Sequence, residues 1–287
     1  LNTVILSANY YDNYVFKVEN GVALSDASHA DLHFQAAPGF DSTSSSATGL
    51  PTGSVTARLT GSSGIPTGYD FKVMYYDGES RLIQTRSTHI MGGYNHTLLT
   101  YNFIGLPTKQ RNIHVAPGKT TQDELYTYTY DNAGRLLTTS HKLNNNNEVV
   151  VEHNEYDELG RLKTQKKGIL PASTYTYNVR SWMKSITGTL FSQTLYYNDS
   201  YTGNSPRYNG NISAMSWKAG SETLRVYRFT YDGLSRITKA DYLLNGSLND
   251  NYKVPSISYD KHGNITALQR WGKTSSGYDM VDNLTLG

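Results

Sequence analysis

The sequence has no cysteine and little charge, and both shortages limit the kinds of protein it can encode. Without cysteine no disulfide can stabilise the fold, although secreted proteins can also fold without disulfides. Charged residues make up 17% of the 287 positions, and the formal net charge is only +2 at pH 7. Lysine and arginine are scattered, with Lys166-Lys167 as the densest cluster, so we expect no nucleic-acid partner.

Long apolar runs are missing as well. No stretch approaches the roughly 18 apolar residues of a membrane-spanning helix, and no signal peptide is recognisable. We therefore expect no membrane span. The chain starts at Leu1 without methionine and stops at Gly287, directly after VDNLTL, which has the pattern of another strand. We expect this sequence to be a piece of a larger protein.

Tyrosine is abundant, with 24 residues against 7 phenylalanines and 3 tryptophans. A tyrosine ring supplies apolar surface while its hydroxyl stays hydrated or finds a partner, which suits broad sheets with half-exposed faces. Threonine, serine, asparagine and glycine are also common, and the runs of alanine, glutamate, leucine and lysine that are typical of helical proteins are missing. The composition predicts an all-β fold.

A short phrase of the form Tyr-Asp-x-x-Gly-Arg-Leu, such as YDNAGRLLT, recurs along the chain. Complete copies begin at Tyr76, Tyr130, Tyr156, Tyr231 and Tyr259, and eroded copies begin at Tyr101, Tyr177 and Tyr208. The spacing of roughly 20 to 30 residues is uneven, which excludes a solenoid of fixed period but fits one structural unit with variable loops. The residues that we expect to form the repeat turns are Tyr76, Asp77, Arg81, Tyr130, Asp131, Gly134, Arg135, Tyr156, Asp157, Gly160, Arg161, Tyr231, Asp232, Arg236, Tyr259, Asp260 and Gly263.

Each copy is predicted to form a β-hairpin. Tyr126, Tyr128 and Tyr130 alternate with other residues before the turn, which is the period-two pattern of a strand. Asp131 can accept hydrogen bonds from backbone N–H groups two residues on, and this initiates a turn. Gly134 can supply a positive φ that a side chain would resist. Turn chemistry, not catalysis, accounts for these residues.

Some copies vary the turn. Where the fifth position is serine, a glycine stands at the third position, which we interpret as a relocation of the flexible residue (Gly78 with Ser80, and Gly233 with Ser235). In the copy at Tyr208 the loop is two residues shorter. Its Asn209-Gly210 pair predicts a tight hairpin turn there.

An arginine recurs just after the turn, and two interpretations are open for it (Arg81, Arg135, Arg161 and Arg236). The favoured interpretation is an ion pair or hydrogen bond to the turn aspartate or to a neighbouring hairpin, because the guanidinium group can bridge two acceptors. The alternative is a row of anion-binding arginines.

The repeated Tyr-Asp-x-x-Gly-Arg-Leu phrase resembles the YD repeat of the Rhs family, which includes bacterial Rhs and wall-associated polymorphic toxins, insecticidal toxin complex B/C subunits and the animal teneurins. Segments such as YNVRSWMKSI, LFSQTLYYND and YDKHGNITALQR are similar to Rhs proteins common in Bacteroidetes. The resemblance covers about residues 70–270. Residues 1–70, with ANYYDNYVF and TGLPTGSVTARL, resemble the lead-in strands and Ser/Gly-rich loop of such proteins, and residues 71–287 the hairpin array.

The resemblance implies a fold, a role and a location. In that family, YD hairpins join edge to edge into a strip that spirals into a hollow shell around a C-terminal toxin or other cargo. It therefore implies a curved sheet strip that forms part of a β-shell, a C-terminal toxin or effector as partner, and a secreted or cell-surface bacterial protein. Edge-to-edge joining is physically reasonable, because an isolated hairpin is marginally stable and a strip pairs all but its two end edges.

The sequence also departs from the family pattern. Such proteins typically carry an Asp-Pro autoproteolysis motif before the toxin, and none of the eight prolines here follows an aspartate. We therefore expect the autoproteolytic segment and the toxin to be absent. Because eight hairpins are few for a closed cavity, we expect an open, curved fragment of a shell.

No catalytic constellation stands out. His29 and His33 have the i, i+4 spacing of two zinc ligands on a helix, but no metalloprotease motif follows, so we expect no metal. The GSSG stretch at residues 61–64 lacks the pattern of a nucleophile elbow and indicates a loop. We expect residues 41–68 to form a long loop or irregular hairpin, and residues 144–147 a hairpin loop. The sequence predicts a non-enzymatic protein without a cofactor.

Two roles remain open. The first is a structural container, the shell segment of a polymorphic toxin that acts in competition between bacteria. The second is a surface adhesin for glycans or for another cell surface, because sheet faces rich in tyrosine and asparagine can stack against sugars and form hydrogen bonds with them. An enzymatic role has no supporting constellation in the sequence.

Overall fold

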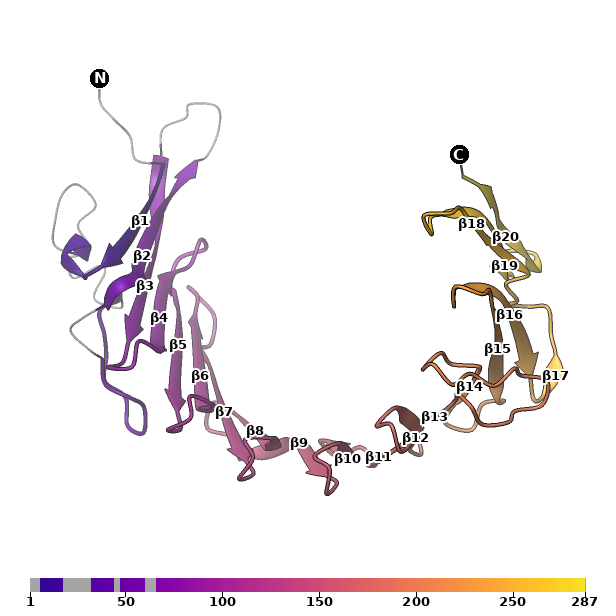
Figure 1. The fold of residues 1–287 in the computed structure, drawn as a ribbon. Coiled ribbons are helices and arrows are strands. Elements are labelled where there is room, and N and C mark those ends of the chain that lie inside the picture. Colours follow the sequence, from indigo (N-terminus) through magenta and orange to yellow (C-terminus); the bar gives the residue numbers. More distant parts are fainter. Residues whose placement is uncertain (1–5, 18–31, 44–46, 60–65, 287) are drawn as a thin grey trace. The chain divides into compact units, whose positions relative to one another are not determined.

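The computed structural model describes residues 6–17, 32–43, 47–59 and 66–286 (Figure 1). These residues form twenty β-strands and one short 3-10 helix, Val15–Lys17. The predicted all-β fold is therefore confirmed. Contacts divide the chain into two compact units, Leu1–His153 and Asn154–Gly287.

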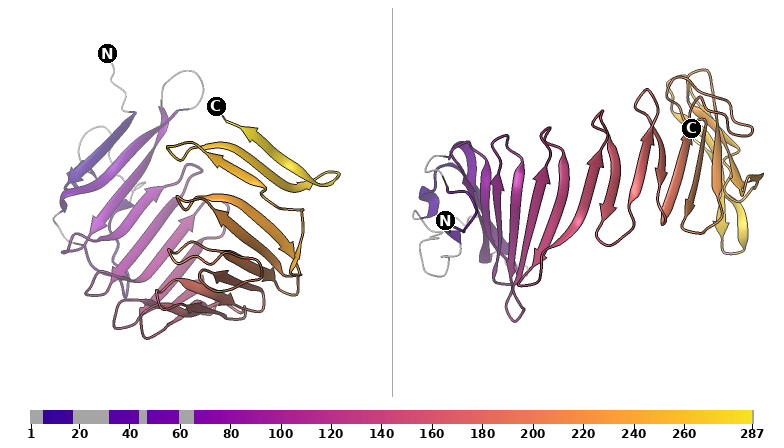
Figure 2. Two further views of the ribbon diagram at one scale, coloured as in Figure 1. Left: turned by 45° about the vertical axis from the view of Figure 1, so that its right-hand side comes forward. Right: turned by 90° about the horizontal axis from the view of Figure 1, so that it is seen from below.

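Unit 1 is a sheet in which each strand pairs antiparallel with the strand that follows it in sequence. Figure 2 shows these strands following one another side by side, from indigo to magenta. The strands are β1 Ser7–Asp12, β2 Ala47–Leu59, β3 Pro66–Tyr76, β4 Leu82–Thr88, β5 Tyr94–Tyr101, β6 Pro107–Val115, β7 Gln122–Tyr130, β8 Leu136–Leu143 and β9 Val149–Tyr156. The unit boundary lies within β9.

Unit 2 continues the same pattern of sequential antiparallel pairs. Its first strands are β10 Leu162–Lys167, β11 Ser173–Tyr177, β12 Met183–Thr187, β13 Phe191–Tyr196, β14 Ala214–Ala219, β15 Arg225–Tyr231, β16 Ile237–Leu244 and β17 Ser247–Leu248. A separate three-stranded sheet contains β18 Ser256–Tyr259, β19 Ile265–Thr274 and β20 Gly277–Thr285. The array of successive antiparallel hairpins predicted from the repeat is thus present in both units.

The hairpins with Tyr-Asp turns share an irregularity in strand register. In the hairpin of β7 and β8, Thr129 pairs with Thr138 while Tyr130 pairs with Leu136, so Leu137 is an extra residue in β8. The same shift occurs at the tyrosine that precedes the turns at Asp77, Asn102, Asn178, Asp232 and Asp260. Such a β-bulge bends and twists the strand. The repeat therefore encodes a strand irregularity as well as a turn.

The main buried cluster of unit 1 lies on β2, β3 and β4. Val55, Phe71, Val73, Tyr75 and Ile83 are each at most 8% exposed and pack together. The Tyr75 hydroxyl donates to the backbone carbonyl of Leu32 at 2.8 Å, so the segment before β2 is tied to the same cluster. This cluster anchors one end of the hairpin array.

Two loops predicted from the sequence can be compared with the structure. Of residues 41–68, β2 and β3 pair as a hairpin with a register shift between Arg58 and Leu59, so the irregular hairpin is correct for the described part; residues 60–65 lie outside it. Residues 144–147 connect β8 to β9, where the backbone N–H of Asn146 donates to the Leu143 carbonyl at 3.0 Å.

The hairpin predicted at Tyr208 is wrong. Tyr196 pairs with Ala214, so residues 197–213 form a long connection between β13 and β14 instead of a strand pair. Gly210 has a φ of 97°, and Asn209 Oδ1 accepts from the N–H of Asn211 at 3.2 Å, so a local turn does form. A favourable turn pair makes a hairpin only where strands flank it, and here the flanking residues are not strands.

Candidate functional site

The repeated Tyr-Asp turns are the feature that the chain builds most often. In the first one, Asp77 Oδ1 accepts hydrogen bonds from the backbone N–H groups of Glu79 and Arg81, both at 2.9 Å. Its other oxygen, Oδ2, accepts from Arg81 Nε at 2.7 Å. One carboxylate thereby satisfies two backbone donors of the turn and positions the arginine that ends it.

The same contacts recur in the later turns. Asp131 accepts from the N–H groups of Ala133 and Arg135 at 2.9 Å and from Arg135 Nε at 2.6 Å. Distances at Asp157 and Asp232 agree within 0.1 Å. At Asp260, Asn264 Nδ2 donates to the carboxylate at 2.8 Å in place of the arginine.

The eroded copies keep the backbone part of this geometry. Asn102 Oδ1 accepts from the N–H groups of Ile104 and Leu106 at 3.2 and 2.9 Å. Asn178 Oδ1 does the same with Arg180 and Trp182, at 2.9 and 3.1 Å. An amide oxygen can accept both backbone bonds, so the turn forms without a charge, and what the asparagine turns lose is the ion pair.

The fifth position of the turn has a positive φ whichever residue occupies it. Gly134 has a φ of 78° and Gly160 a φ of 82°, and Ser80 and Ser235 adopt 64° and 65° at the same position. Gly78 and Gly233 are not in this region of the backbone map, so the interpretation that they take over the flexible role is wrong. The hydrogen-bonded turn determines the backbone shape, and serine accepts the resulting strain.

The turn contacts lower the pKa of the turn carboxyls. The backbone N–H of Arg135 and the Arg135 guanidinium hold the pKa of Asp131 below its ordinary value. Burial alone would raise the pKa of Asp77, but the N–H and guanidinium of Arg81 and the N–H of Glu79 together lower it. For Asp260 the leading cause of the lowered pKa is the Asn264 amide. These carboxyls are therefore ionised acceptors at neutral pH.

A tyrosine at most of the turns contacts the preceding hairpin. Tyr101 donates its hydroxyl to the backbone carbonyl of Leu82, at 2.8 Å. The acceptor is the residue that follows the arginine of the earlier turn. We call this contact the tyrosine bond. At distances of 2.7 to 2.9 Å it also joins Tyr76 to Pro51, Tyr130 to Pro107, Tyr177 to Leu162, Tyr197 to Met183, Tyr231 to Ile212 and Tyr259 to Ile237.

Burial keeps these phenols in the donating form. It raises the pKa of Tyr101, Tyr130 and Tyr231 above the ordinary value, so they stay protonated at neutral pH. Tyr197 makes the same bond, although Tyr197-Asn198 is not among the copies of the repeat that the sequence predicts. The signal was available, because Tyr-Asn also opens the copies at Tyr101 and Tyr177.

Three of the turn arginines, Arg81, Arg161 and Arg236, contact the following hairpin. Arg81 Nη1 donates to the carbonyl of Asn102 at 3.1 Å, and its guanidinium lies 5.1 Å from the centre of the Tyr101 ring. Arg236 makes the equivalent contacts with the Asp260 carbonyl at 3.0 Å and the Tyr259 ring at 4.6 Å. These guanidinium groups are engaged by an aspartate, a carbonyl and an aromatic ring, which accounts for them as bridges between hairpins.

Other predicted features carry no comparable geometry. Among the described residues, no group of three or more histidines, aspartates and glutamates could hold a metal ion. His29 lies outside those residues, so the structure does not test the His29 and His33 pair. In the described parts of the chain no helix is long and apolar enough to cross a membrane.

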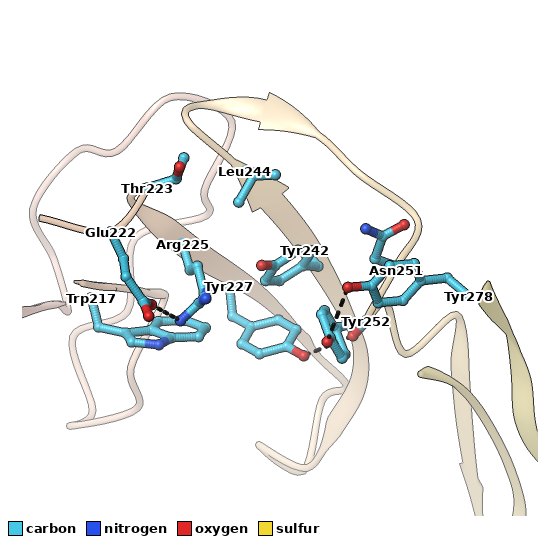
Figure 3. A pocket seen from close by; sticks show the side chains of 10 residues that line it. All are labelled: Trp217, Glu222, Thr223, Arg225, Tyr227, Tyr242, Leu244, Asn251, Tyr252 and Tyr278. Carbon is cyan, nitrogen blue, oxygen red and sulfur yellow. Dashed lines mark hydrogen bonds and ion pairs between the residues drawn. The ribbon is translucent and has the colours of Figure 1, made fainter. Parts of the chain in front are cut away.

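A second candidate site in unit 2 has the form of a pocket, with a cavity volume of about 650 Å³. Figure 3 shows its side chains turned toward one another from β14, β15, β16, β20 and the two loops beside them. We call it the aromatic pocket, and its lining is Trp217, Glu222, Thr223, Arg225, Tyr227, Tyr242, Leu244, Asn251, Tyr252 and Tyr278. The sequence did not indicate this pocket, because its residues come from separate repeat units.

The fold and the repeated turn together define an array of antiparallel YD-type hairpins that are joined to one another by tyrosine bonds and arginine contacts. No protein-family model matches the chain, and no curated protein matches it.

Among solved structures, the chain is similar to TcdB2-TccC3 and to TcdB2-TccC3 without the hypervariable C-terminal region. Each comparison gives a TM-score of 0.42 and 13% identity over 83% of this chain. The TcdB2-TccC3-Cdc42 structure matches the same share at a TM-score of 0.34 and 14% identity. The chain spans 14 to 17% of the length of these chains.

Proposed function

We propose that the chain is a non-catalytic wall segment of an Rhs-type YD-repeat shell. The observation that carries the proposal is the two-sided linkage seen in the repeats at Tyr76 and Tyr231: a tyrosine that bonds to the hairpin before it and an arginine that contacts the hairpin after it. A repeat that commits its recurring polar groups to both neighbours is built to extend a continuous sheet. Its side chains contribute to a wall rather than to an active site.

The larger protein would use such a wall to enclose a cargo. The resemblance of the repeats to the Rhs family supports a C-terminal toxin or effector as that cargo, in a bacterial protein that is secreted or held at the cell surface and acts in competition between cells. Residues 1–70 would supply the lead-in strands, and residues 71–287 the hairpin array.

The first test of the proposal is genetic. The gene should continue past the codon for Gly287 into further Tyr-Asp repeats and then into a domain of unrelated sequence. A reading frame that encodes only additional binding modules, with no effector-like domain, would contradict the container role.

The second test is limited proteolysis of the full-length gene product. The C-terminal domain should be degraded more slowly inside the intact protein than as an isolated domain at the same protease concentration. The matched control is the isolated domain mixed with residues 1–287 added in trans, which should not protect it. Equal rates in the intact and isolated forms would exclude enclosure.

Glycan binding, the second role that the sequence allows, is compatible with a wall. A specific observation favours it, namely the aromatic pocket of unit 2, which combines five aromatic rings with hydrogen-bonding side chains. Binding there would add recognition to the shell without requiring catalysis.

A further inference from the structure

The aromatic pocket is large enough for a small ligand. Its volume of about 650 Å³ falls within the range of roughly 300 to 1,000 Å³ found for small-molecule sites. All of its residues belong to unit 2, and three strands supply its floor. Tyr227 pairs with Tyr242 across β15 and β16, and Trp217 pairs with Arg225 across β14 and β15, so these side chains lie on one face of the sheet.

The rings form a curved wall. Trp217 and Tyr227 are stacked with centroids 5.5 Å apart and an interplanar angle of 22°. Tyr252 stands nearly perpendicular to Tyr242 and to Tyr278, at 78° and 79°, with centroids 5.2 Å apart in both pairs. The wall therefore changes from a flat platform at Trp217 to the upright ring of Tyr252, beside which the Tyr278 ring lies crosswise (Figure 3).

Hydrogen bonds hold this wall in place. The Tyr227 hydroxyl donates to the Tyr252 carbonyl at 2.7 Å, and the Tyr252 hydroxyl donates to the Tyr278 hydroxyl at 3.4 Å. The loop that carries Tyr252 is thus tied to both sheets of unit 2. The pocket is shaped before any ligand arrives, which reduces the entropy cost of binding.

The charged groups of the lining neutralise each other. Glu222 and Arg225 form an ion pair at 2.9 Å over one end of the floor. The remaining polar groups are the side chains of Thr223 and Asn251, the Trp217 indole N–H and the phenol hydroxyls. Because Glu222 and Arg225 are paired with each other, the lining offers no unpaired counter-charge to a cationic or an anionic ligand. A wholly apolar ligand would remove these polar groups from water without replacing their hydrogen bonds.

We propose that the aromatic pocket binds an uncharged carbohydrate, with a pyranose ring stacked on the Trp217 and Tyr227 platform. A pyranose ring has an apolar face of C–H groups and a rim of hydroxyls, so it requires an aromatic surface beside groups that both donate and accept. Glu222 supplies a hydrogen-bond acceptor and Arg225 supplies donors at one end of the floor. The Asn251 amide supplies both a donor and an acceptor near Tyr252 and Tyr278. This proposal rests on the glycan-binding role and specifies its site and its class of ligand. It does not depend on the container role.

The proposal is tested by isothermal titration of residues 1–287 with neutral oligosaccharides: cellobiose, maltotriose, mannobiose and N,N′-diacetylchitobiose. Sialyllactose and spermidine serve as anionic and cationic probes. At least one neutral sugar should bind with a dissociation constant below about 1 mM, which corresponds to about −4 kcal/mol. Failure of every neutral sugar to bind, or binding of a charged probe alone, would overturn the proposal.

Two variants test whether the sugar binds in the aromatic pocket. Tyr278→Ala and Asn251→Ala should each weaken binding of the neutral sugar by about tenfold, the loss expected when an anchoring contact is removed. Tyr278 is 44% exposed, so its truncation leaves the buried floor intact. Tyr208→Ala is the matched control, because Tyr208 is 67% exposed and lies outside the pocket. If the pocket variants melt like the wild type and bind with unchanged affinity, the sugar binds elsewhere and the assignment is wrong.

Discussion

A single aspartate organises each Tyr-Asp turn, because its carboxylate accepts from two backbone N–H groups and from a side chain at once. The asparagine turns show that the backbone bonds alone suffice to form the turn. At this scale the turn residues differ in what they contribute. The aspartate or asparagine closes the turn, the fifth residue takes the positive φ, and the tyrosine and arginine contact other hairpins.

Replacing Gly134 with valine should lower the free energy of unfolding by about 1 to 3 kcal/mol, because a β-branched residue resists the φ of 78°. Gly134→Ser should lower the free energy of unfolding by less than Gly134→Val, since Ser80 and Ser235 adopt this backbone conformation naturally. Gly78→Val is the control, because Gly78 does not have a positive φ and a Cβ there meets nothing within 4 Å. Thermal melts compare the three, and equal melting temperatures would contradict the argument.

Tyr101→Phe removes one tyrosine bond and leaves the ring in place. We expect a loss of about 1 kcal/mol in the free energy of unfolding, because the Leu82 carbonyl loses its donor. Tyr208→Phe should change nothing measurable, since that side chain is 67% exposed. Urea denaturation measures both. Identical midpoints for Tyr101→Phe and the wild type would show that water replaces the hydroxyl at no cost.

The lowered pKa values of the turn carboxyls predict how stability depends on pH. A carboxyl whose pKa is lower in the folded state stabilises the fold above its unfolded pKa, and this stabilisation is lost as pH falls through the folded pKa. The backbone N–H and the guanidinium of Arg161 lower the pKa of Asp157, although burial opposes them. The melting temperature should therefore fall on acidification below about pH 4.

Asp157→Asn tests the contribution of one turn. The variant should melt at a lower temperature than the wild type at pH 7, because it lacks the ion pair, although the amide keeps the backbone bonds as at Asn178. Its melting temperature should fall less on acidification, because the amide has no charge to titrate. Glu158→Gln, at the exposed variable position of the same turn, is the control and should follow the wild-type profile. Parallel profiles for Asp157→Asn and the wild type would disprove this account.

At the scale of elements, the hairpins are linked by side chains as well as by strand pairing. The three-stranded sheet of β18, β19 and β20 is not part of the β10–β17 sheet, yet three contacts tie this sheet and the segment that leads into it to β16 and the turn before β16. Tyr259 donates to the Ile237 carbonyl at 2.7 Å, Arg236 bonds to the Asp260 carbonyl, and Ala240 forms a β-bridge with Val254. Side chains of the repeat therefore maintain the array where the strand ladder stops.

Arg236→Ala should loosen this connection locally. Loss of the bond to Asp260 and of the contact with the Tyr259 ring should cost about 1 to 2 kcal/mol. Amide hydrogen exchange should speed up in β18 and β19 but not in β13. Lys261→Ala, an exposed change in the next turn, is the control. Uniform acceleration across unit 2, or none, would argue against a local bridge.

At the scale of the whole molecule, contacts between strands are almost entirely between sequence neighbours, as in repeat proteins. In such arrays stability is the sum of local terms, so unfolding need not be all-or-none. The buried cluster around Val73 and Tyr75 gives one part of unit 1 a local hydrophobic core.

We therefore expect thermal unfolding in more than one step, with a calorimetric enthalpy larger than the van't Hoff enthalpy. Gly134→Val should shift a transition of unit 1, and Arg236→Ala a transition of unit 2. Differential scanning calorimetry of both variants is the measurement. A single transition that moves equally in both would mean that the array unfolds as one cooperative body.

The amino-acid sequence alone determined the class of fold and the position of most turns. Period-two patterns and the Tyr-Asp phrase are local signals, and a turn closed by its own aspartate needs no distant partner. The glycine interpretation failed at Ser80 and Ser235 because hydrogen bonds, not residue type, set the backbone there. The Tyr208 hairpin failed because the pairing of β13 with β14 decides what Asn209-Gly210 can do.

Only the tertiary structure decided what lies between the repeats. The Leu82 carbonyl that accepts from Tyr101 belongs to an earlier hairpin, and the Tyr101 ring beside Arg81 belongs to a later one, so neither partner can be read within one copy. The aromatic pocket gathers Trp217 and Tyr278 from strands far apart in sequence. Local hydrogen bonds are encoded in a few consecutive residues, whereas contacts between hairpins depend on strand register and twist, which arise only when the sheet assembles.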